Sequence, residues 1–433
     1  MKIAIIGSGI AGNVVARHLH QAHEITVFEA ADHIGGHTHT HAIALDGEHH
    51  QIDTGFIVFN DWTYPNFIKL LDELGVASQP SAMSFSVRNE TSGVEYNGTS
   101  LNTLFAQRLN LLRTSFHRMI RDILRFNREA PGLLALEGPE LALGDYLSAG
   151  RYSRQFIEDY LIPMGAAIWS TDPALMLDFP ARYFVRFFHN HGMLSVDHRP
   201  QWRVIRGGSA RYVEKLVAPF RHRIRLNAAV ATVRRTGGGV FVKTRDAAPE
   251  RFDQVFFACH SDQALRLLAD ASPLEREVLG AIRYQENEVV LHTDCSLLPR
   301  KRLAWAAWNY HIAATDEAGQ APRVALTYNM NILQNLKSRH TFCVTLNRTD
   351  EIDQRRIIKR LTYHHPLYTP AGVAAQQRQH EVNGVNHTYF CGAYWRCGFH
   401  EDGVVSALNA LQHFSARHTS DTDHAQRHLS RVG

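Results

Sequence analysis

The spacing of three glycines near the N-terminus constrains this chain more than any other feature of its sequence. A short apolar segment, residues 3–6, is followed by Gly7-x-Gly9-x-x-Gly12 and then by a helix-forming stretch. In a strand-turn-helix unit the first glycine allows a tight turn, the second lets the backbone approach a pyrophosphate, and the third lets helix and strand pack closely. The new helix also points free backbone amides at the phosphates. The pattern predicts a dinucleotide-binding unit.

An acidic residue at the end of the next strand strengthens this prediction. Residues 25–28 form a second apolar strand, and Glu29 follows it directly. A carboxylate at that point accepts hydrogen bonds from the ribose diol of a bound dinucleotide. A chance glycine turn would explain the three glycines, but not the strand, helix and acid around them. Glu29 alone does not distinguish FAD from NAD.

Composition narrows the class of protein. A chain of 433 residues is too long for one small core and predicts two or three domains. With 46 basic and 42 acidic side chains and no basic tail, the sequence predicts no nucleic-acid partner. Its five scattered cysteines lack metal-ligand spacing and fit a reducing cytosol. No apolar run is long enough to span a membrane, and the first strand enters the glycine turn directly. We therefore expect a cytoplasmic protein without a signal peptide.

Two further segments separate the candidate cofactors. The sequence "ADHIGGHTHT" (31–40) places Gly35-Gly36 soon after the acid, and "QIDTGFIVFN" (51–60) supplies residues 53–55, Asp-Thr-Gly. With these segments the chain resembles the flavin-containing amine oxidase and phytoene desaturase superfamily, whose members have a Gly-Gly-Arg-type turn and an Asp-x-Gly element beside the isoalloxazine. His37 stands in the usual arginine place. The resemblance implies FAD. The usual cysteine-attachment motif is absent, so we expect the FAD to be non-covalent, although Cys391, Cys397 and His37 offer alternative attachment points.

The resemblance also implies the fold. We expect an α/β protein with a Rossmann-type FAD-binding domain, similar to glutathione reductase, and a discontinuous α+β substrate domain. The expected FAD-binding domain comprises residues 1–60, 201–275 and 385–416, and the substrate domain comprises 61–200 and 276–384. Residues 417–433 are polar and are expected to form a flexible tail. Residues 202–220 predict a strand, a glycine pair and a helix, and residues 224–259 predict an antiparallel meander followed by a returning strand.

The C-terminal stretch "YFCGAYWRCGFHEDGVVSALNAL" (389–411) completes the expected site. The resemblance directs the strand that ends at Gly392 toward the ribityl-phosphate region, and it directs the following helix toward the flavin pyrimidine. Asp402 is the expected N-cap, and the apolar residues beyond it repeat at helical spacing. Ala393 stands where the family carries an acid, which removes one expected contact.

The predicted site combines these segments. By resemblance, Val230 holds the adenine through its backbone. Alternating His37, His39 and His41 resemble zinc ligands, but they follow a turn expected at the flavin and lack a neighbouring carboxylate, so we predict no metal site. The predicted cofactor-binding residues are Gly7, Gly9, Ile10, Ala11, Gly12, Glu29, Ala30, Gly35, Gly36, His37, Asp53, Thr54, Gly55, Phe56, Val230, Gly392, Glu401, Asp402, Gly403 and Val404.

The residues that would act on a substrate are less defined. Amine oxidases of the family usually hold a lysine near the flavin, whereas the matching run "AIRYQENEVVLHTD" (281–294) has none and carries Asn287. No side chain is assigned as a catalytic acid or base. Each aromatic candidate for the substrate pocket also has an interpretation as a core residue. The candidates are Trp169, Tyr394, Trp395 and His400, with Phe399 beside them.

Residues 101–128 read as one amphipathic helix with an apolar face opposite Arg118, Arg121, Arg125 and Arg128. Such a helix can lie in an anionic membrane interface, which leaves peripheral contact at the inner face of the membrane as one interpretation. The simpler interpretation, which we favour, is an ordinary helix with a solvated arginine face.

Three functions are compatible with these patterns. The leading hypothesis is an FAD-dependent oxidoreductase that abstracts hydride from an apolar substrate. The segments "AWAAWNY" (304–310), "IWSTDP" (168–173) and "FHEDG" (399–403) resemble a bacterial NAD/FAD-binding subgroup linked to desaturation of methyl-branched fatty-acyl chains. That resemblance implies a lipid or other small-molecule substrate, and a methyltransferase or a redox acceptor as partner. The alternatives are an amine or amino-acid oxidase and a non-catalytic FAD-binding partner protein.

Overall fold

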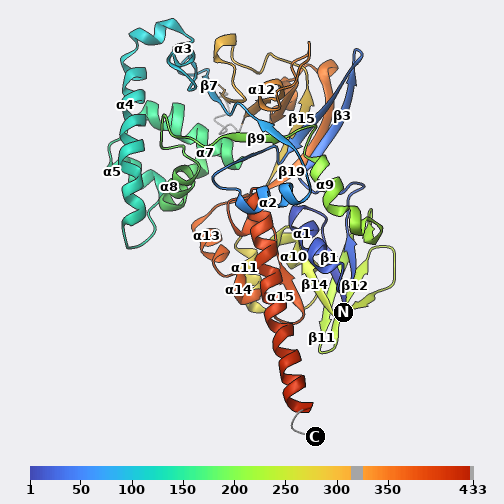
Figure 1. The fold of residues 1–433 in the computed structure, drawn as a ribbon. Helices are drawn as coiled ribbons and strands as arrows, with labels where there is room; N and C mark the ends of the chain where they lie inside the picture. Colours follow the sequence, from blue (N-terminus) through green and yellow to red (C-terminus); the bar gives the residue numbers. More distant parts are fainter. Residues whose placement is uncertain (314–324, 430–433) are drawn as a thin grey trace.

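A five-stranded parallel sheet forms the centre of one half of the protein. The computed structural model describes residues 1–313 and 325–429 (Figure 1). The sheet order is β10-β2-β1-β14-β20, and every neighbouring pair is parallel. Its strands are β1 (Lys2–Ile6), β2 (Glu24–Phe28), β10 (Ile224–Arg225), β14 (Gln254–Phe257) and β20 (Thr388–Phe390). The sheet therefore joins segments from three distant parts of the sequence.

Both faces of this sheet are covered, as a parallel sheet requires. Successive side chains of β1 enter opposite cores, because strand side chains alternate. Ile3 and Ile5 pack with three helices, α1 (Ile10–Leu19), α9 (Ala210–Val217) and α15 (His400–Leu429). Ala4 and Ile6 pack with the opposite layer, which comprises β11 (Val230–Thr236), β12 (Gly239–Thr244), β13 (Glu250–Phe252), α10 (Ser261–Leu267) and α11 (Pro273–Gly280).

The predicted organisation of residues 202–259 is confirmed. Strand β9 (Trp202–Ile205) precedes Gly207-Gly208 and α9. The buried side chains of α9 are those of Tyr212, Val213, Leu216 and Val217. Strands β11, β12 and β13 form an antiparallel meander, and β14 returns to the parallel sheet beside β1.

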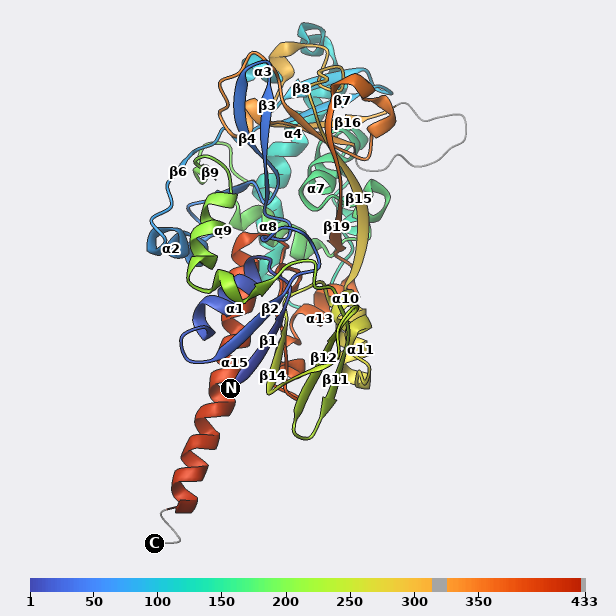
Figure 2. The same cartoon turned by 90° about the vertical axis from the view of Figure 1, so that its right-hand side faces the viewer.

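A seven-stranded sheet organises the other half, in the order β19-β15-β18-β17-β16-β7-β8. The two longest strands pair antiparallel from Arg283 opposite Leu367 to His292 opposite Ile357. Figure 2 shows them running from the upper sheet down to the parallel-sheet half. The strands are β7 (Phe85–Asn89), β8 (Val94–Asn97), β15 (Arg283–His292), β16 (Trp308–Ile312), β17 (Leu326–Asn329), β18 (Cys343–Leu346) and β19 (Ile357–Leu367).

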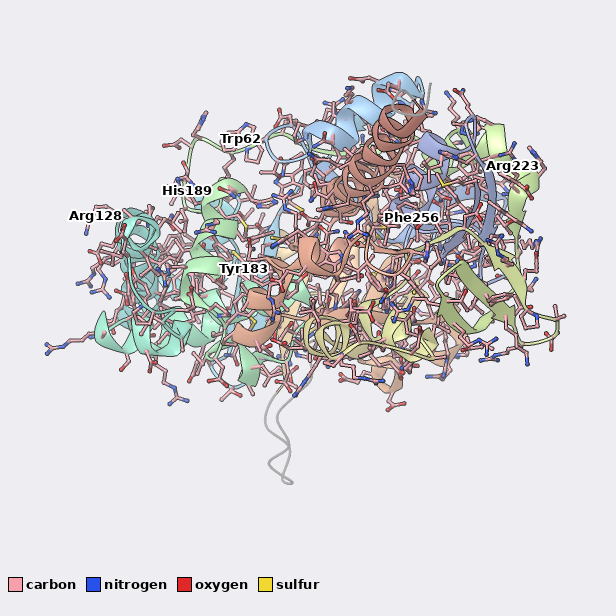
Figure 3. All side chains as sticks on the ribbon, turned by 90° about the horizontal axis from the view of Figure 1, so that it is seen from below. Trp62, Arg128, Tyr183, His189, Arg223 and Phe256 are labelled. Atoms are coloured by element: carbon pink, nitrogen blue, oxygen red, sulfur yellow. The ribbon has the colours of Figure 1, made fainter. Side chains whose placement is uncertain are left out.

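Smaller elements connect and cover the two halves. A hairpin of β3 (His39–Leu45) and β4 (Glu48–Gly55) packs against the seven-stranded sheet, and β5 (Val58–Asn60) and β6 (Ser78–Pro80) form a small three-stranded sheet with β9. The remaining helices are α2 (Pro65–Glu73), α3 (Leu101–Leu104), α4 (Thr114–Glu129), α5 (Leu143–Ala149), α6 (Arg154–Phe156), α7 (Ile162–Trp169), α8 (Ala181–Asn190), α12 (Met330–Leu333), α13 (Pro370–Gln376) and α14 (Gln379–Val382). In Figure 3, Arg128 of α4 and Arg223 beside the parallel sheet lie at opposite ends of the molecule.

The prediction of one continuous helix over residues 101–128 is wrong. The segment contains α3, a 3-10 turn at Arg108–Leu112, and α4. The guanidinium of Arg108 donates hydrogen bonds to the backbone carbonyls of Asn102 and Phe105, which a continuous α-helix would use for its own ladder. From the predicted apolar face, Phe116 and Met119 enter the core, and Leu104, Phe105, Ile120 and Ile123 pack against it while partly buried. Leu101 and Leu112 remain exposed.

The C-terminal helix differs from its prediction at both ends. It begins at His400, two residues before the predicted N-cap, and the Asp402 carboxylate reaches back to accept a hydrogen bond of 2.9 Å from the Phe399 amide. Residues 417–429, expected as flexible tail, continue α15, since neither glycine nor proline occurs between Val404 and Leu429. Residues 430–433 lie outside the described residues. Within the described part of the chain, no helix is both long and apolar enough to cross a bilayer.

A buried ion pair fixes the meander against α11 and provides a test of this packing. Arg235 of β11 contacts both carboxylate oxygens of Glu275, and each side chain is only 3% exposed. Glu275→Gln would leave the buried Arg235 guanidinium with the half-exposed Asp270 carboxylate as its charged partner, so most of the compensation of this buried charge would be lost. We expect Glu275→Gln to lower the free energy of unfolding by about 3 kcal/mol.

Urea denaturation measures this change. The matched control is Glu158→Gln, because Glu158 pairs with Arg154 on the surface. The control should lower the free energy of unfolding by less than about 1 kcal/mol. Equal effects of the two substitutions would show that the buried pair does not anchor the meander.

Candidate functional site

The N-terminus of α1 is built to face an anion. Gly9 is its N-cap residue and provides no side-chain cap, and the first bond of the helical ladder runs from the Asn13 amide to the Gly9 carbonyl. The amides of the first turn therefore have no partner within the helix. A Cβ at Gly12 would lie 2.0 Å from the Gly7 carbonyl oxygen, whereas a Cβ at Gly9 would meet no atom within 4 Å. Gly12 is required for packing, and Gly9 keeps space open.

That space is part of a cavity of about 400 Å³, which we call the cofactor cavity. Its lining brings residues 7–11 together with residues 392–394, as the sequence predicted. Gly9 forms a parallel β-bridge with Gly35. Strand β14 lies between β1 and β20, so the residues that follow it, 258–260, lie between the segments of Gly7 and Gly392. The opposite wall comes from β19, with Leu361 to Pro366. Segments almost four hundred residues apart thus form one elongated cavity.

Glu29 has the geometry of a ribose contact. Its buried carboxylate accepts hydrogen bonds from the Ser8 amide at 2.9 Å, the Ser8 hydroxyl at 2.6 Å and the Ala31 amide at 2.9 Å. A carboxylate has about four acceptor positions, so it retains capacity for a further hydroxyl donor. Glu29 also lines the cofactor cavity. The cavity, the free helix amides and this carboxylate together fit FAD.

The predicted cofactor residues divide into two groups. Those that line the cofactor cavity are Gly7, Gly9, Ile10, Ala11, Glu29, Gly35, Gly36, His37, Phe56 and Gly392. Gly12 packs behind it. Thr54 and Gly55 line an adjoining pocket. Ala30 is exposed and Ala31 takes its place on the cavity wall, while Val230 pairs with Thr244 at the start of the meander and does not line the cavity.

Asp53 connects protein segments. It is fully buried and accepts hydrogen bonds from the Ser209 amide at 2.9 Å, from the hydroxyl of Thr40 and from the side-chain amide of Gln334 at 3.1 Å. Burial raises its pKa from 3.8 to about 6. Asp53 fixes the Gly207-Gly208 turn to β4 and is absent from the cofactor-cavity lining.

Residues at the start of α15 contact other helices of the protein. The Glu401 carboxylate accepts hydrogen bonds from the amides of Asn66 and Phe67, at 3.2 and 2.8 Å, and so caps α2. Gly403 lets α15 approach α1, because a Cβ there would lie 2.5 Å from the Ile10 side chain. Residues 401–404 do not line the cofactor cavity.

Two more cavities continue from the cofactor cavity toward the surface. An inner pocket of about 140 Å³ shares six lining residues with it, namely His37, Phe56, Tyr363, His365, Pro366 and Gly398. An outer pocket of about 320 Å³ shares four apolar residues with the inner pocket, namely Val58, Ile168, Trp308 and Phe399. The three cavities therefore adjoin in series.

The structure separates the four predicted substrate-pocket residues. Trp169 and His400 line the inner pocket. Tyr394 lines the cofactor cavity. Trp395 faces a different cavity, between α8 and α13. Burial lowers the pKa of His400 to about 3, and its ring stacks on Phe67 at 4.3 Å between centroids.

Sequence reasoning missed the contribution of β19. Its His365 lines both the cofactor cavity and the inner pocket, and its Nδ1 lies 3.0 Å from the side-chain amide nitrogen of buried Asn287 on β15. Burial lowers the pKa of His365 to about 3, so the ring is neutral. With Nδ1 accepting from the amide, the ring proton resides on Nε2. The adjacent histidines His364 and His365 were a visible signal, but their strand partner was not.

The fold and these cavities define a flavin-binding protein of the amine oxidase class. The family model for flavin containing amine oxidoreductase matches residues 10–299, which is more than half of the chain. This chain belongs to that family. The predictions of an α/β fold with a Rossmann-type FAD-binding domain, and of FAD as cofactor, are confirmed.

Individual relatives show how far the likeness extends. A protein named as a flavin-containing monoamine oxidase, AofH, from Mycobacterium tuberculosis is 27% identical over 260 residues. That match spans 58% of this chain and 55% of the relative, or about half of its length. Two solved structures share the fold over nearly the whole chain. The CLA-producing fatty acid isomerase from P. acnes has a TM-score of 0.66 at 17% identity and covers 95% of this chain and 98% of its own. Cyclohexylamine oxidase from Brevibacterium oxydans has a TM-score of 0.65 at 16% identity, covering 94% and 97%.

The open space at Gly9 predicts a selective loss of flavin. A valine there would place its Cβ more than 4 Å from other protein atoms, and its side chain would occupy space at the wall of the cofactor cavity. We expect Gly9→Val to fold normally but to retain less than about a tenth of the flavin, measured as the ratio of absorbance at flavin and protein wavelengths. Gly132→Val is the control, because Gly132 also has open space and lies outside the cofactor cavity. Retention of flavin by the Gly9 variant would contradict the assignment.

The neutral histidines predict a pH dependence of stability. The folded-state pKa of His400, about 3, is below its ordinary value of 6.5, so the unfolded chain binds more protons between these values. This contribution to stability is complete above the ordinary pKa and is lost as the pH falls. At pH 5 the stability lost should amount to about 2 kcal/mol. We expect the free energy of unfolding to fall between pH 7.5 and 5 by about that much more in the native protein than in His400→Gln, with FAD saturating. Parallel pH profiles would disprove it.

Proposed function

We propose that the protein is an FAD-dependent oxidoreductase that removes a hydride from an apolar, elongated substrate, with the fatty-acyl chain of a lipid as the substrate class. The observation that carries this proposal is the series of adjoining cavities. The outer pocket is mainly apolar and adjoins the inner pocket, which in turn adjoins the cofactor cavity. When bound, FAD supplies a two-electron oxidation. The chain's own residues then have to position a carbon atom and exclude water.

The inner pocket favours an uncharged substrate. None of its lining residues is an aspartate, glutamate, lysine or arginine. Its histidines are His37, His365 and His400, and burial lowers the pKa of each to about 4 or below. A protonated amine would lose its hydration without meeting a carboxylate, which is unfavourable. Apolar carbon would be buried favourably against the same walls.

Strand β15 supports the same substrate class. It contains no lysine, and its buried polar residue facing β19 is Asn287. Asn287 holds His365 at the boundary of the two cavities, where a neutral imidazole can donate one hydrogen bond but cannot supply a positive charge. This arrangement positions atoms at the boundary and does not provide a strong base.

The outer pocket can accommodate the rest of a long substrate. Its walls include Met83, Phe85, Met164, Met193 and Trp202, and flexible methionines adapt to chains of different shape. Arg199 is the charged residue of this lining. A carboxylate or phosphate head group beside Arg199 would leave the acyl chain directed inward. The fatty acid isomerase with the same fold acts on a fatty acid, which is consistent with this use of the scaffold.

Amine oxidation is the second candidate function. The relative from Mycobacterium tuberculosis is named as a monoamine oxidase, and cyclohexylamine oxidase shares the fold. Tyr328, Tyr363 and Tyr368 line the inner pocket, and aromatic faces can attract an ammonium group. The absence of a carboxylate from that lining favours the apolar substrate over this one.

Anaerobic bleaching of the bound flavin distinguishes the candidates. A phospholipid extract from a bacterium should bleach the visible absorbance of the flavin, and mass analysis should show an acyl chain two hydrogens lighter. Bleaching by members of an amine panel, with hydrogen peroxide released in air, would establish amine oxidation instead. A flavin that neither set reduces would support the third hypothesis, a non-catalytic FAD-binding partner protein.

A substitution between the pockets tests the route. Ile168 lines both the inner and outer pockets, and a larger side chain there would narrow the passage. We expect Ile168→Trp to lower kcat/KM for a long-chain substrate at least about tenfold, equivalent to about 1.4 kcal/mol, without loss of flavin. Leu136→Trp is the control, because Leu136 is exposed and lies between α4 and α5. An unchanged kcat/KM would show that substrates do not pass Ile168.

A further inference from the structure

A group of leucines is exposed where the 101–128 segment departs from its predicted helix. The exposed fractions are 77% for Leu101, 71% for Leu109, 51% for Leu111 and 83% for Leu112. Four strongly exposed leucines within twelve residues form a concentration of apolar surface that soluble surfaces seldom carry without a partner. We call residues 101–112 the leucine segment. In Figure 1, α3 and the adjoining end of α4 lie at the upper left edge of the molecule, far from α15.

Two of these leucines, Leu101 and Leu112, belong to the apolar face that the sequence singled out for a membrane, whereas Leu109 and Leu111 do not. The apolar residues of α4, such as Phe116, Met119 and Phe126, pack into the protein core and cannot contact another surface. Leu109 and Leu111 belong to the 3-10 turn that interrupts the predicted helix. The interruption therefore leaves the leucines of this turn unburied.

Basic side chains surround the leucine segment. The segment from Tyr96 to Arg121, with both ends included, has four arginines and no acidic residue. Arg108 and Arg113 donate hydrogen bonds to backbone carbonyls and to the Asn102 side chain, and within the described residues neither forms an ion pair. Their positive charge therefore remains available to an external anion.

A second basic segment lies beside the first. The 3-10 turn Arg302–Ala304 packs against α3, and the Asn97 side chain donates a hydrogen bond of 2.9 Å to the Trp305 carbonyl. Arg300, Lys301, Arg302 and Leu303 are all exposed. No acidic residue occurs between Ser296 and Ala313. The two segments together form an apolar surface with a positively charged border.

This surface adjoins the outer pocket. Gly98 and Thr99 line that pocket, and Ser100 and Leu101 follow them directly in the chain. Phe85 and Tyr96, on the strands that carry this segment, line the same pocket. Leu101 thus lies close to the lining of the outer pocket, and the rest of the leucine segment continues from it along the chain.

We propose that residues 101–112 and 300–303 form a docking surface for an anionic phospholipid bilayer. Leucines that enter the acyl boundary with a border of arginine and lysine at the head groups are the pattern of interfacial membrane binding. Basic residues near an anionic surface add an electrostatic attraction to it. A protein partner is less compatible, because its contact residues would be enriched in aromatic side chains rather than in leucine. The use of this surface to deliver acyl chains rests on the function proposed above, but the docking itself does not.

Vesicle sedimentation of the FAD-loaded protein tests the proposal without requiring turnover. The vesicles contain either phosphatidylcholine alone or phosphatidylcholine and phosphatidylglycerol in the ratio 3:1. We expect binding to the anionic vesicles, weakened in high salt, and little binding to the neutral ones. The combined variant Leu109→Ser, Leu111→Ser and Leu112→Ser should lower the partition coefficient at least about tenfold. The combined variant Arg300→Ala and Lys301→Ala should lose most of the preference for anionic vesicles.

The matched control replaces leucines that are exposed elsewhere, in the combined variant Leu124→Ser, Leu136→Ser and Leu175→Ser. It should bind vesicles as the native protein does, and all variants should keep their flavin and circular dichroism. Native protein that does not sediment with anionic vesicles, or a triple variant that binds equally well, would overturn the proposal. A concentration-dependent dimer that disappears in the triple variant, without vesicle binding, would assign the surface to a second copy of the chain. Vesicle binding without flavin bleaching by detergent-dispersed lipid would refute the proposed function and leave the docking surface intact.

Discussion

Parallel pairing of β1 with both β2 and β14 is the constraint from which the rest of the site follows. It places Gly7, Glu29 and Ala258 at one edge of a single sheet, because the carboxyl ends of parallel strands emerge on the same side. Strand β20 joins beside β14 and delivers Gly392 to that edge. The same sheet directs the N-terminus of α1, with its free amides, into the cavity. Without this register the segments would have no common ligand.

The second constraint is burial of neutral polar groups at the boundary between the two halves. Strand β19 spans both halves, so its side chains form the cofactor-cavity wall and the inner-pocket wall together. Histidines at this boundary have pKa values lowered by burial, and the tyrosines there have raised ones, so both types remain uncharged. A low-charge wall favours apolar substrate and strengthens each hydrogen bond that remains. Chemical selectivity therefore arises from what the boundary excludes as well as from what it positions.

Local sequence was a good guide where a residue's role depends on backbone conformation. Gly7 has a φ of +105°, which favours glycine, and Gly12 packs so closely against the Gly7 carbonyl that a Cβ would not fit. The spacing of the glycines alone indicates both requirements. Asp53 and Glu401 show where such inference stops. Asp53 was selected through the resemblance, as part of an Asp-x-Gly element, and Glu401 as part of the start of the C-terminal helix. In the structure Asp53 holds the turn before α9 and Glu401 caps α2. Their partners, Ser209 and Phe67, are more than 150 and 300 residues away, and no local pattern indicates them.

The sequence by itself determined the strand-turn-helix unit, the ribose acid, the meander and the family, because each depends on spacing within about thirty residues. Only the tertiary structure decided that β19 pairs with β15, that His365 and Asn287 meet, and that three cavities adjoin in series. It also decided which leucines of residues 101–128 remain exposed, since exposure depends on what the rest of the folded chain covers. The physical reason is common to all of these: strand pairing and burial depend on contacts between distant segments, and hydrophobic periodicity records only that a face is apolar, not what covers it.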